Sequence, residues 1–266
     1  MIKTYLQFIN EGRSVEISTD NVLYTIEKYA PWYNVNNVKE PIYRGLKGFE
    51  IQKEDGSYPN AFITKPSESI RPSAAYYNIL IDNLPEWKDY PKRSKSLICS
   101  TDTRGAGSYG EVYRVIPLIE GFKLGVCPTH DLWTSFNEGL KLFEPEFHLR
   151  GLDDFDLINR ELFSYLSSIH GKVDTTTYAS ILKAYEIFES LTSMPTEIAR
   201  IRTATRGEKL IDFFNKVLDP VKNGFKHIGY NNSTRIKTEN MVGKRYKEVW
   251  TSADCLLIKE SLLTND

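Results

Sequence analysis

Three short segments of the 266-residue chain carry residue types that can perform chemistry together. Arg44 lies in the segment IYRGL, Ser100 and Thr101 lie in ICSTD, and Glu248 lies in KEVW. A guanidinium is a forked, permanently charged donor that suits phosphate oxygens. A fixed carboxylate can stabilise positive charge that develops in a transition state, and a neighbouring hydroxyl can fix the orientation of that carboxylate.

Each of these residues also has an ordinary structural interpretation. An arginine in a strand usually covers apolar surface with its stem. A Ser-Thr pair at a strand end usually satisfies local backbone groups, and a glutamate that begins a strand is usually solvated. The functional interpretation therefore depends on the order of the three segments and on the strands that carry them.

The pattern of apolar residues predicts the elements that position these segments. Residues 103–110 (TRGAGSYG) read as a glycine-rich loop, and 230–246 as a polar surface loop. Helical spacing marks 18–30 and 73–84, and again 155–169, 178–188 and 210–218. Alternating or short apolar runs predict strands at 41–46, 96–102, 111–119, 123–128, 248–250 and 255–258.

This order of elements predicts an α+β fold. Residues 138–222 form a helical block between two strand-rich parts. The strands on either side of the block are too few to bury a sheet alone, so we interpret the block as an insertion and not as the boundary between two independent domains.

Composition narrows the class of protein. Hydrophobic residues make up 41% and charged residues 26% of the chain, the net charge is −1 and the pI is about 6.5. This balance does not indicate a dedicated nucleic-acid binder, and no apolar run is long enough to span a membrane. The cysteines form no CxxC pair and no Cys/His cluster, so we expect no metal site and a reducing compartment; they are Cys99, Cys127 and Cys255.

In this order the three segments resemble the signature of the arginine-type mono-ADP-ribosyltransferases, which is an Arg, Ser-Thr-Ser, Glu series on the strands of a split sheet. The Alt and Mod enzymes of T-even bacteriophages belong to that family. The resemblance covers the strand-rich segments at about 41–136 and 226–260, and it gives the helical block no counterpart. The matching triplets are Tyr43-Arg44-Gly45, Ser100-Thr101-Asp102 and Glu248-Val249-Trp250.

The resemblance implies a fold and its boundaries. We expect a single ADP-ribosyltransferase-like domain over 12–266, with a split β-sheet core, an N-terminal helix and a helical insertion at about 138–222. It also implies an enzyme that consumes NAD as a substrate and needs no metal.

The resemblance further implies the role of each matching residue. Glu248, Ser100 and Arg44 are the expected catalytic residues. Cleavage of the nicotinamide–ribose bond passes through an oxocarbenium-like state, which Glu248 would stabilise while the Ser100 hydroxyl orients it. Arg44, Gly45, Ser100 and Thr101 are the expected NAD-binding residues: Arg44 for the phosphates, Gly45 for close approach of the nicotinamide amide, and Thr101 for the pocket wall.

Two positions depart from the family pattern. Asp102 replaces the last serine of the second triplet, and we expect it to change the packing of the following loop. Tyr246 stands where arginine-modifying members carry a second glutamate, so no adjacent base is there to orient an acceptor guanidinium. Glu239 could substitute for it. Transfer to a host protein, transfer to nucleic acid and hydrolysis of NAD all remain open.

The first residues, MIKTYLQFINE, carry a second resemblance. Ile2, Tyr5, Leu6 and Ile9 fall at helical spacing, but the segment lacks the apolar core of a secretory signal. It resembles the capsid-targeting peptides of internal head proteins of T-even-like phages, which end in an (I/L)-x-E site cut by a prohead protease. The resemblance implies a propeptide over 1–11, cleavage after Glu11, contacts with the prohead scaffold and protease, and delivery from the virion head to the host cytoplasm.

Two alternatives stay beside the phage transferase. One is a non-enzymatic internal head or host-binding protein on a degenerate transferase fold, which predicts no NAD binding. The other is a different glycosyl-transfer or hydrolysis enzyme that uses Glu248 and Asp102, which leaves Arg44 with only a generic anion-binding role.

Overall fold

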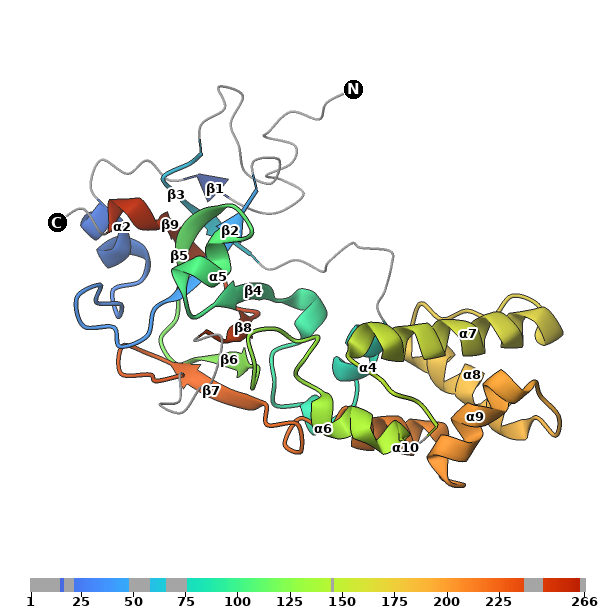
Figure 1. The fold of residues 1–266 in the computed structure, drawn as a ribbon. Helices are drawn as coiled ribbons and strands as arrows, with labels where there is room; N and C mark the ends of the chain where they lie inside the picture. The colour runs from blue at the N-terminus through green and yellow to red at the C-terminus, as the bar shows by residue number, and fades with distance from the viewer. Residues whose placement is uncertain are drawn as a thin grey trace, which may run out of the picture. The chain divides into compact units, whose positions relative to one another are not determined.

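The computed structural model describes residues 15–16, 22–47, 58–65, 76–144, 146–236 and 246–263 (Figure 1). The chain divides into two compact units, which we call the sheet unit (1–69, 90–130 and 226–266) and the helical unit (70–89 and 131–225). The segment 138–222, predicted as an insertion, is part of the helical unit, which also takes in the helix predicted at 73–84. The predicted propeptide over 1–11 and Glu239 lie outside the described residues.

The sheet unit is built on one antiparallel sheet, so the predicted α+β class is confirmed. In the described residues it has nine strands in the order β1-β3-β9-β5-β2-β4-β8-β6-β7. The strands predicted from the sequence are all present, whereas β1, β3 and β7 were not predicted. The bounds are β1 Val15–Glu16, β2 Ile42–Leu46, β3 Ala61–Thr64, β4 Leu97–Ser100, β5 Glu111–Pro117, β6 Phe122–Val126, β7 Lys226–Tyr230, β8 Glu248–Thr251 and β9 Cys255–Lys259.

The core of the sheet unit follows from its most apolar strands. β9 (CLLIK) and β5 (EVYRVIP) pair along five positions, from Tyr113 opposite Lys259 to Pro117 opposite Cys255. Both strands are buried over most of their length, because helix α2 (Val22–Tyr29) and the chain after it pack on them with Ile26 and Tyr33. The short 3₁₀ helices η2 (Arg93–Lys95) and η4 (Glu260–Leu262) also belong to this unit.

The segment expected to be a glycine-rich loop begins with a short helix, α5 (Thr103–Gly107). The sequence prediction was wrong here because Asp102 acts as an N-cap: its side chain accepts the backbone N–H of Arg104 at 2.8 Å. Helix α5 packs against β2, β4 and β5 (Figure 1). It can lie so close to β2 because Gly45 has no side chain in the way.

The helical unit buries a cluster of aromatic side chains, among them Phe143, Phe155, Tyr185 and Phe214. The helices predicted at 155–169, 178–188 and 210–218 are confirmed as α7, α8 and α10. The bounds are α4 Tyr76–Ile81, η1 Pro85–Trp87, α6 Asn137–Leu140, η3 Lys141–Phe143, α7 Leu152–His170, α8 Tyr178–Ser190, α9 Thr196–Thr205 and α10 Leu210–Val217.

One carboxyl group joins α4 to α7 inside the helical unit. Asp156 of α7 is buried and accepts the backbone N–H of Tyr77 at 3.2 Å. Burial raises the pKa of Asp156 from 3.8 to about 7, an effect that this hydrogen bond and nearby Arg160 only partly oppose. The folded state therefore holds a proton that the unfolded state releases near pH 4, so the stability from this group is present below pH 4 and is lost as pH rises through 7.

We expect Asp156→Asn to remove this pH dependence. An amide cannot ionise, yet its oxygen still accepts the Tyr77 N–H, so the variant should match wild type below pH 4 and be more stable at pH 8 by up to about 4 kcal/mol, so the two pH values compared are 3.5 and 8. Thermal unfolding at the two pH values measures the difference. Glu161→Gln is the control, because Glu161 lies exposed on the same helix and is not among the groups that shift the pKa of Asp156. Equal pH dependence in wild type and Asp156→Asn would contradict the expectation.

Candidate active site

The predicted site residues lie on three neighbouring strands of the sheet unit. Ser100, the last residue of β4, stands directly opposite Glu248, the first residue of β8. Ser100 is also opposite Tyr43 of β2, the one pair in the ladder register between β2 and β4 in the described chain. The ladder between β2 and β4 is therefore short and lies at the predicted residues.

Direct cross-strand partners place their side chains on the same face of a sheet. Tyr43, Ser100 and Glu248 therefore share one face. Gly45 and Trp250 share it too, because each lies two positions further along its strand.

The Glu248 carboxylate is held by two donors. Arg93 of η2 donates from Nη2 to Oε1 at 2.7 Å, and the Cys127 thiol lies 3.7 Å from the same oxygen. The side chains of Arg93 and Glu248 are only 11% and 13% exposed, so this ion pair is largely shielded from solvent. In the residues that the structure describes, Oε2 of Glu248 makes no hydrogen bond and is the oxygen left for a ligand.

Ser100 and Thr101 have different contacts. The Ser100 hydroxyl accepts the backbone N–H of Asp102 at 3.2 Å, so the expected orientation of Glu248 by Ser100 stays a prediction. Thr101 fixes the residue before Glu248 twice: its hydroxyl accepts the Lys247 N–H at 2.9 Å, and its own N–H donates to the Lys247 carbonyl at 3.0 Å. Thr101 therefore holds the start of β8 in register.

Arg44 lies where β2 adjoins β4. Alternation along β2 directs its side chain to the face opposite Tyr43, and its Nη1 donates to the Ile98 carbonyl of β4 at 2.7 Å. Its Nε is buried and has no hydrogen-bond partner in the described chain, so it is an unused donor. The structure thus brings Arg44 to the edge of β4, while Ser100 and Glu248 face each other on the other side of the sheet.

Helix α5 covers the Ser100 end of this group. A Cβ on Gly105 would lie 2.5 Å from Ser100 Oγ and 2.8 Å from the ring of Tyr246, so helix, hydroxyl and ring are closely packed. Tyr246, where the second glutamate would stand, also packs edge-on against His130 with ring centroids 5.8 Å apart. Asp102 is engaged as the cap of α5.

Two titratable groups beside the site have shifted pKa values. Burial raises the pKa of the Cys99 thiol to about 12, although Arg44 and Arg93 oppose the shift. The thiol is thus protonated at neutral pH and is no nucleophile. Burial lowers the pKa of Lys247, and Lys226 lowers it further.

Arg93 is the residue of this group that the sequence did not single out. It lies in the run Lys92-Arg93-Ser94-Lys95, which has the composition of a solvated basic segment. The contact forms because η2 turns the chain just before β4, which places Arg93 over the ring of Trp250 at 5.5 Å. Its only signal in the sequence is the closeness of an arginine to a predicted site strand.

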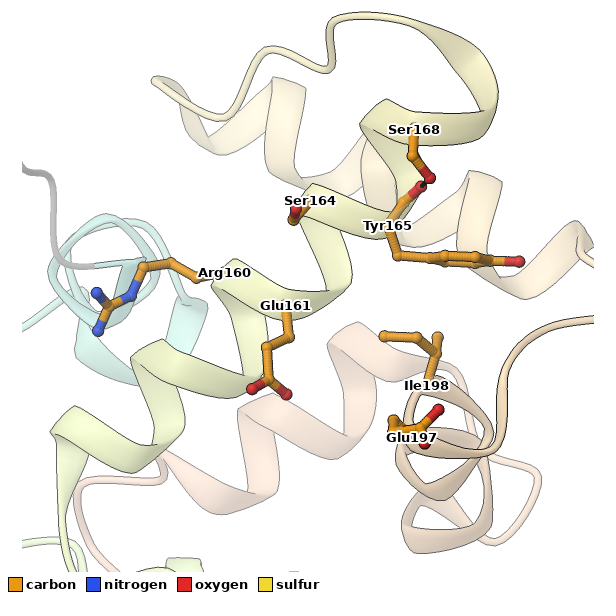
Figure 2. A pocket seen from close by; sticks show the side chains of 7 residues that line it. All are labelled: Arg160, Glu161, Ser164, Tyr165, Ser168, Glu197 and Ile198. Atoms are coloured by element: carbon orange, nitrogen blue, oxygen red, sulfur yellow. Dashed lines mark hydrogen bonds between the residues drawn. The ribbon is translucent and has the colours of Figure 1, made fainter.

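The helical unit has a shallow groove of its own between α7 and α9 (Figure 2). Positively charged, negatively charged and hydroxyl side chains line it, and none of the predicted site residues is among them. The lining residues are Arg160, Glu161, Ser164, Tyr165, Ser168, Glu197 and Ile198. Its mixture of charges indicates no particular ligand chemistry.

Comparison with known proteins gives no relative. No protein-family model, no curated protein and no solved structure matches the chain. Within the described ranges, no group of three or more His, Cys, Asp or Glu side chains is arranged to hold a metal ion. No helix in the described part of the chain is long and apolar enough to cross a membrane.

Proposed function

We propose that the protein is a mono-ADP-ribosyltransferase that cleaves the nicotinamide–ribose bond of NAD and transfers ADP-ribose to a host macromolecule. The observation that carries the proposal is that Arg44, Ser100 and Glu248 lie on β2, β4 and β8, which are neighbours in the sheet. Ser100 and Glu248 stand directly opposite each other. These three residues are far apart in the sequence, and they match the Arg, Ser-Thr, Glu order of the family that the sequence resembles.

The proposed reaction is the cleavage of the nicotinamide–ribose bond, assisted by Glu248 and Arg44. The C–N bond between nicotinamide and ribose breaks, its electron pair goes to the nicotinamide nitrogen, and positive charge develops on the ribose. Glu248 Oε2 accepts a hydrogen bond from a ribose hydroxyl and stabilises that charge. The acceptor then donates a lone pair to the anomeric carbon and releases a proton to solvent. Arg44 is the proposed donor for a phosphate oxygen of NAD. Its Nε is buried on the face opposite Glu248, so this contact requires the Nε to become accessible when NAD binds.

The residue at position 246 affects which class of molecule accepts ADP-ribose. Its ring packs between Gly105 and His130, so it presents an aromatic surface where an arginine-modifying enzyme would present a carboxylate. The proposal therefore leaves the acceptor class as a host protein, nucleic acid or water. Incubation of host lysate with labelled NAD, followed by mass spectrometry of labelled protein and RNA, identifies it.

Titration calorimetry with NAD tests the proposal. We expect wild type to bind NAD with micromolar affinity and Arg44→Gln to bind about 10- to 100-fold more weakly, since one charged hydrogen bond is lost. Arg206→Gln is the control, because Arg206 is exposed and belongs to the helical unit. The proposal fails if wild type neither binds NAD nor releases nicotinamide from it.

One observation favours the non-enzymatic alternative, an internal head or host-binding protein. The carboxylate of Glu248 is already paired with Arg93, which would compete with a ligand for it. That alternative predicts no NAD binding and a tight complex with a particle or host partner. The same calorimetric titration therefore separates the two functions.

We also propose a phage origin and a place in the virion head for the protein before delivery to the host cytoplasm. This rests on the resemblance of residues 1–11 alone, which lie outside the described residues. Mass spectrometry of the N-terminus of the protein in purified virions is the measurement that bears on it.

A further inference from the structure

Arg93 and Glu248 form a pair in which one oxygen is anchored and the other is presented. Oε1 takes both Arg93 Nη2 and the Cys127 thiol, at 2.7 Å and 3.7 Å. Within the described part of the chain, Oε2 has no such contact. A carboxylate bound on one side only has a fixed orientation and can still accept a hydrogen bond from a ligand on the other.

The Arg93 side chain that anchors Glu248 is itself closely packed. The guanidinium carbon of Arg93 lies 5.5 Å from the centre of the Trp250 ring, a cation–π distance. Trp250 is fully buried, and its indole N–H donates to the Pro91 carbonyl at 2.8 Å, two residues before Arg93. The opposing position on β6 is Gly125, where a Cβ would lie 2.1 Å from the Trp250 ring, so the ring fills the space that a side chain there would need.

The two arginines near the site therefore have different positions. Trp250 and Glu248 lie two residues apart on β8 and share a face, and Arg93 contacts both of them. Arg44 leaves β2 on the opposite face and contacts β4. Arg93, and not Arg44, is thus the guanidinium placed to set the geometry of the carboxylate.

We propose that Arg93 is a positioning residue, which fixes Glu248 so that Oε2 points to the ribose of NAD. This inference rests on the proposed function, because it assigns Arg93 a part in that reaction. A carboxylate displaced by about 1 Å loses on the order of 100-fold in rate, so positioning affects turnover more than substrate binding.

The test compares Arg93→Ala with Arg114→Ala in steady-state assays of nicotinamide release. Arg114 is the matched control: it makes an ion pair with Glu260 of similar burial, 8% and 12% exposed, and stacks on Tyr43 at 5.7 Å. We expect Arg93→Ala to lower kcat about 10- to 100-fold and to change KM for NAD by less than about threefold. Added guanidinium chloride should restore part of that kcat, and it should have no such effect on Arg114→Ala.

Each outcome decides the proposal. If Arg93→Ala does not fold, Arg93→Lys replaces it, and a similar loss of kcat at near-normal KM supports positioning because a lysine lacks the planar fork. An unchanged kcat in an active protein overturns the role of Arg93 and leaves the proposed function standing. A raised KM with unchanged kcat, or an equal loss in both alanine variants without rescue, overturns it as well. A wild-type protein that does not cleave NAD overturns both proposals.

Discussion

Replacing Glu248 by glutamine is expected to lower the rate of nicotinamide release from NAD by about 10²–10³-fold, the loss typical of one preorganised electrostatic contact. The amide keeps the shape of the side chain and can still accept the Arg93 hydrogen bond through its oxygen. It carries no negative charge, however, so it cannot offset the positive charge that develops on the ribose. The effect should fall on kcat, because that charge is absent from the ground state.

The glutamine variant also disturbs a buried ion pair, so its stability has to be measured beside its rate. Glu260→Gln is the control, because Glu260 pairs with buried Arg114 in the same unit, as Glu248 pairs with Arg93. Both variants should lose stability, since each leaves a shielded arginine without its full counter-charge. Only Glu248→Gln should lose turnover, and wild-type turnover in that variant would contradict the role of the carboxylate.

The sequence predicted the fold where a segment's own residues determine its state. The runs EVYRVIPLI and CLLI are apolar enough to be strands in almost any context, and they form the buried pair β5 and β9. The strand β7 (KHIGY) was missed because most of its side chains are exposed or half-buried, so it carries no apolar signal. It exists because β6 supplies five cross-strand partners, from Phe122 to Val126.

The candidate site was predictable in part for a similar reason. Arg44, Ser100 and Glu248 could be selected because each lies on a predicted strand, and the register then places Ser100 opposite Glu248. Arg93 could not be selected, because its importance comes from a contact 155 residues along the chain. Nor does the sequence reveal that Arg44 and Glu248 leave the sheet on opposite faces, which depends on the Tyr43–Ser100 register.

Gly45→Ala is expected to destabilise the protein by about 3 kcal/mol or more, through overpacking against backbone. A Cβ at this position would lie 1.9 Å from the carbonyl oxygen of Ala106 and 2.8 Å from its carbonyl carbon. These are backbone atoms of α5, so the clash can be relieved only if the whole helix moves away from β2. The structure thus gives Gly45 a packing role, while its expected contact with nicotinamide stays a prediction.

Movement of α5 also reaches the site, because Gly105 of that helix packs on Ser100 Oγ. We therefore expect Gly45→Ala to lower both the urea midpoint, at an unchanged m-value, and the turnover of NAD. Gly107→Ala is the matched control. Gly107 lies on α5, the helix that Gly45→Ala would displace, and a Cβ there would meet only Val112 Cγ2, at an ordinary contact distance of 3.6 Å. It should change stability by less than about 1 kcal/mol. Equal urea midpoints for Gly45→Ala and Gly107→Ala would contradict the expectation. They would show that α5 moves away from the new methyl group at little cost in stability.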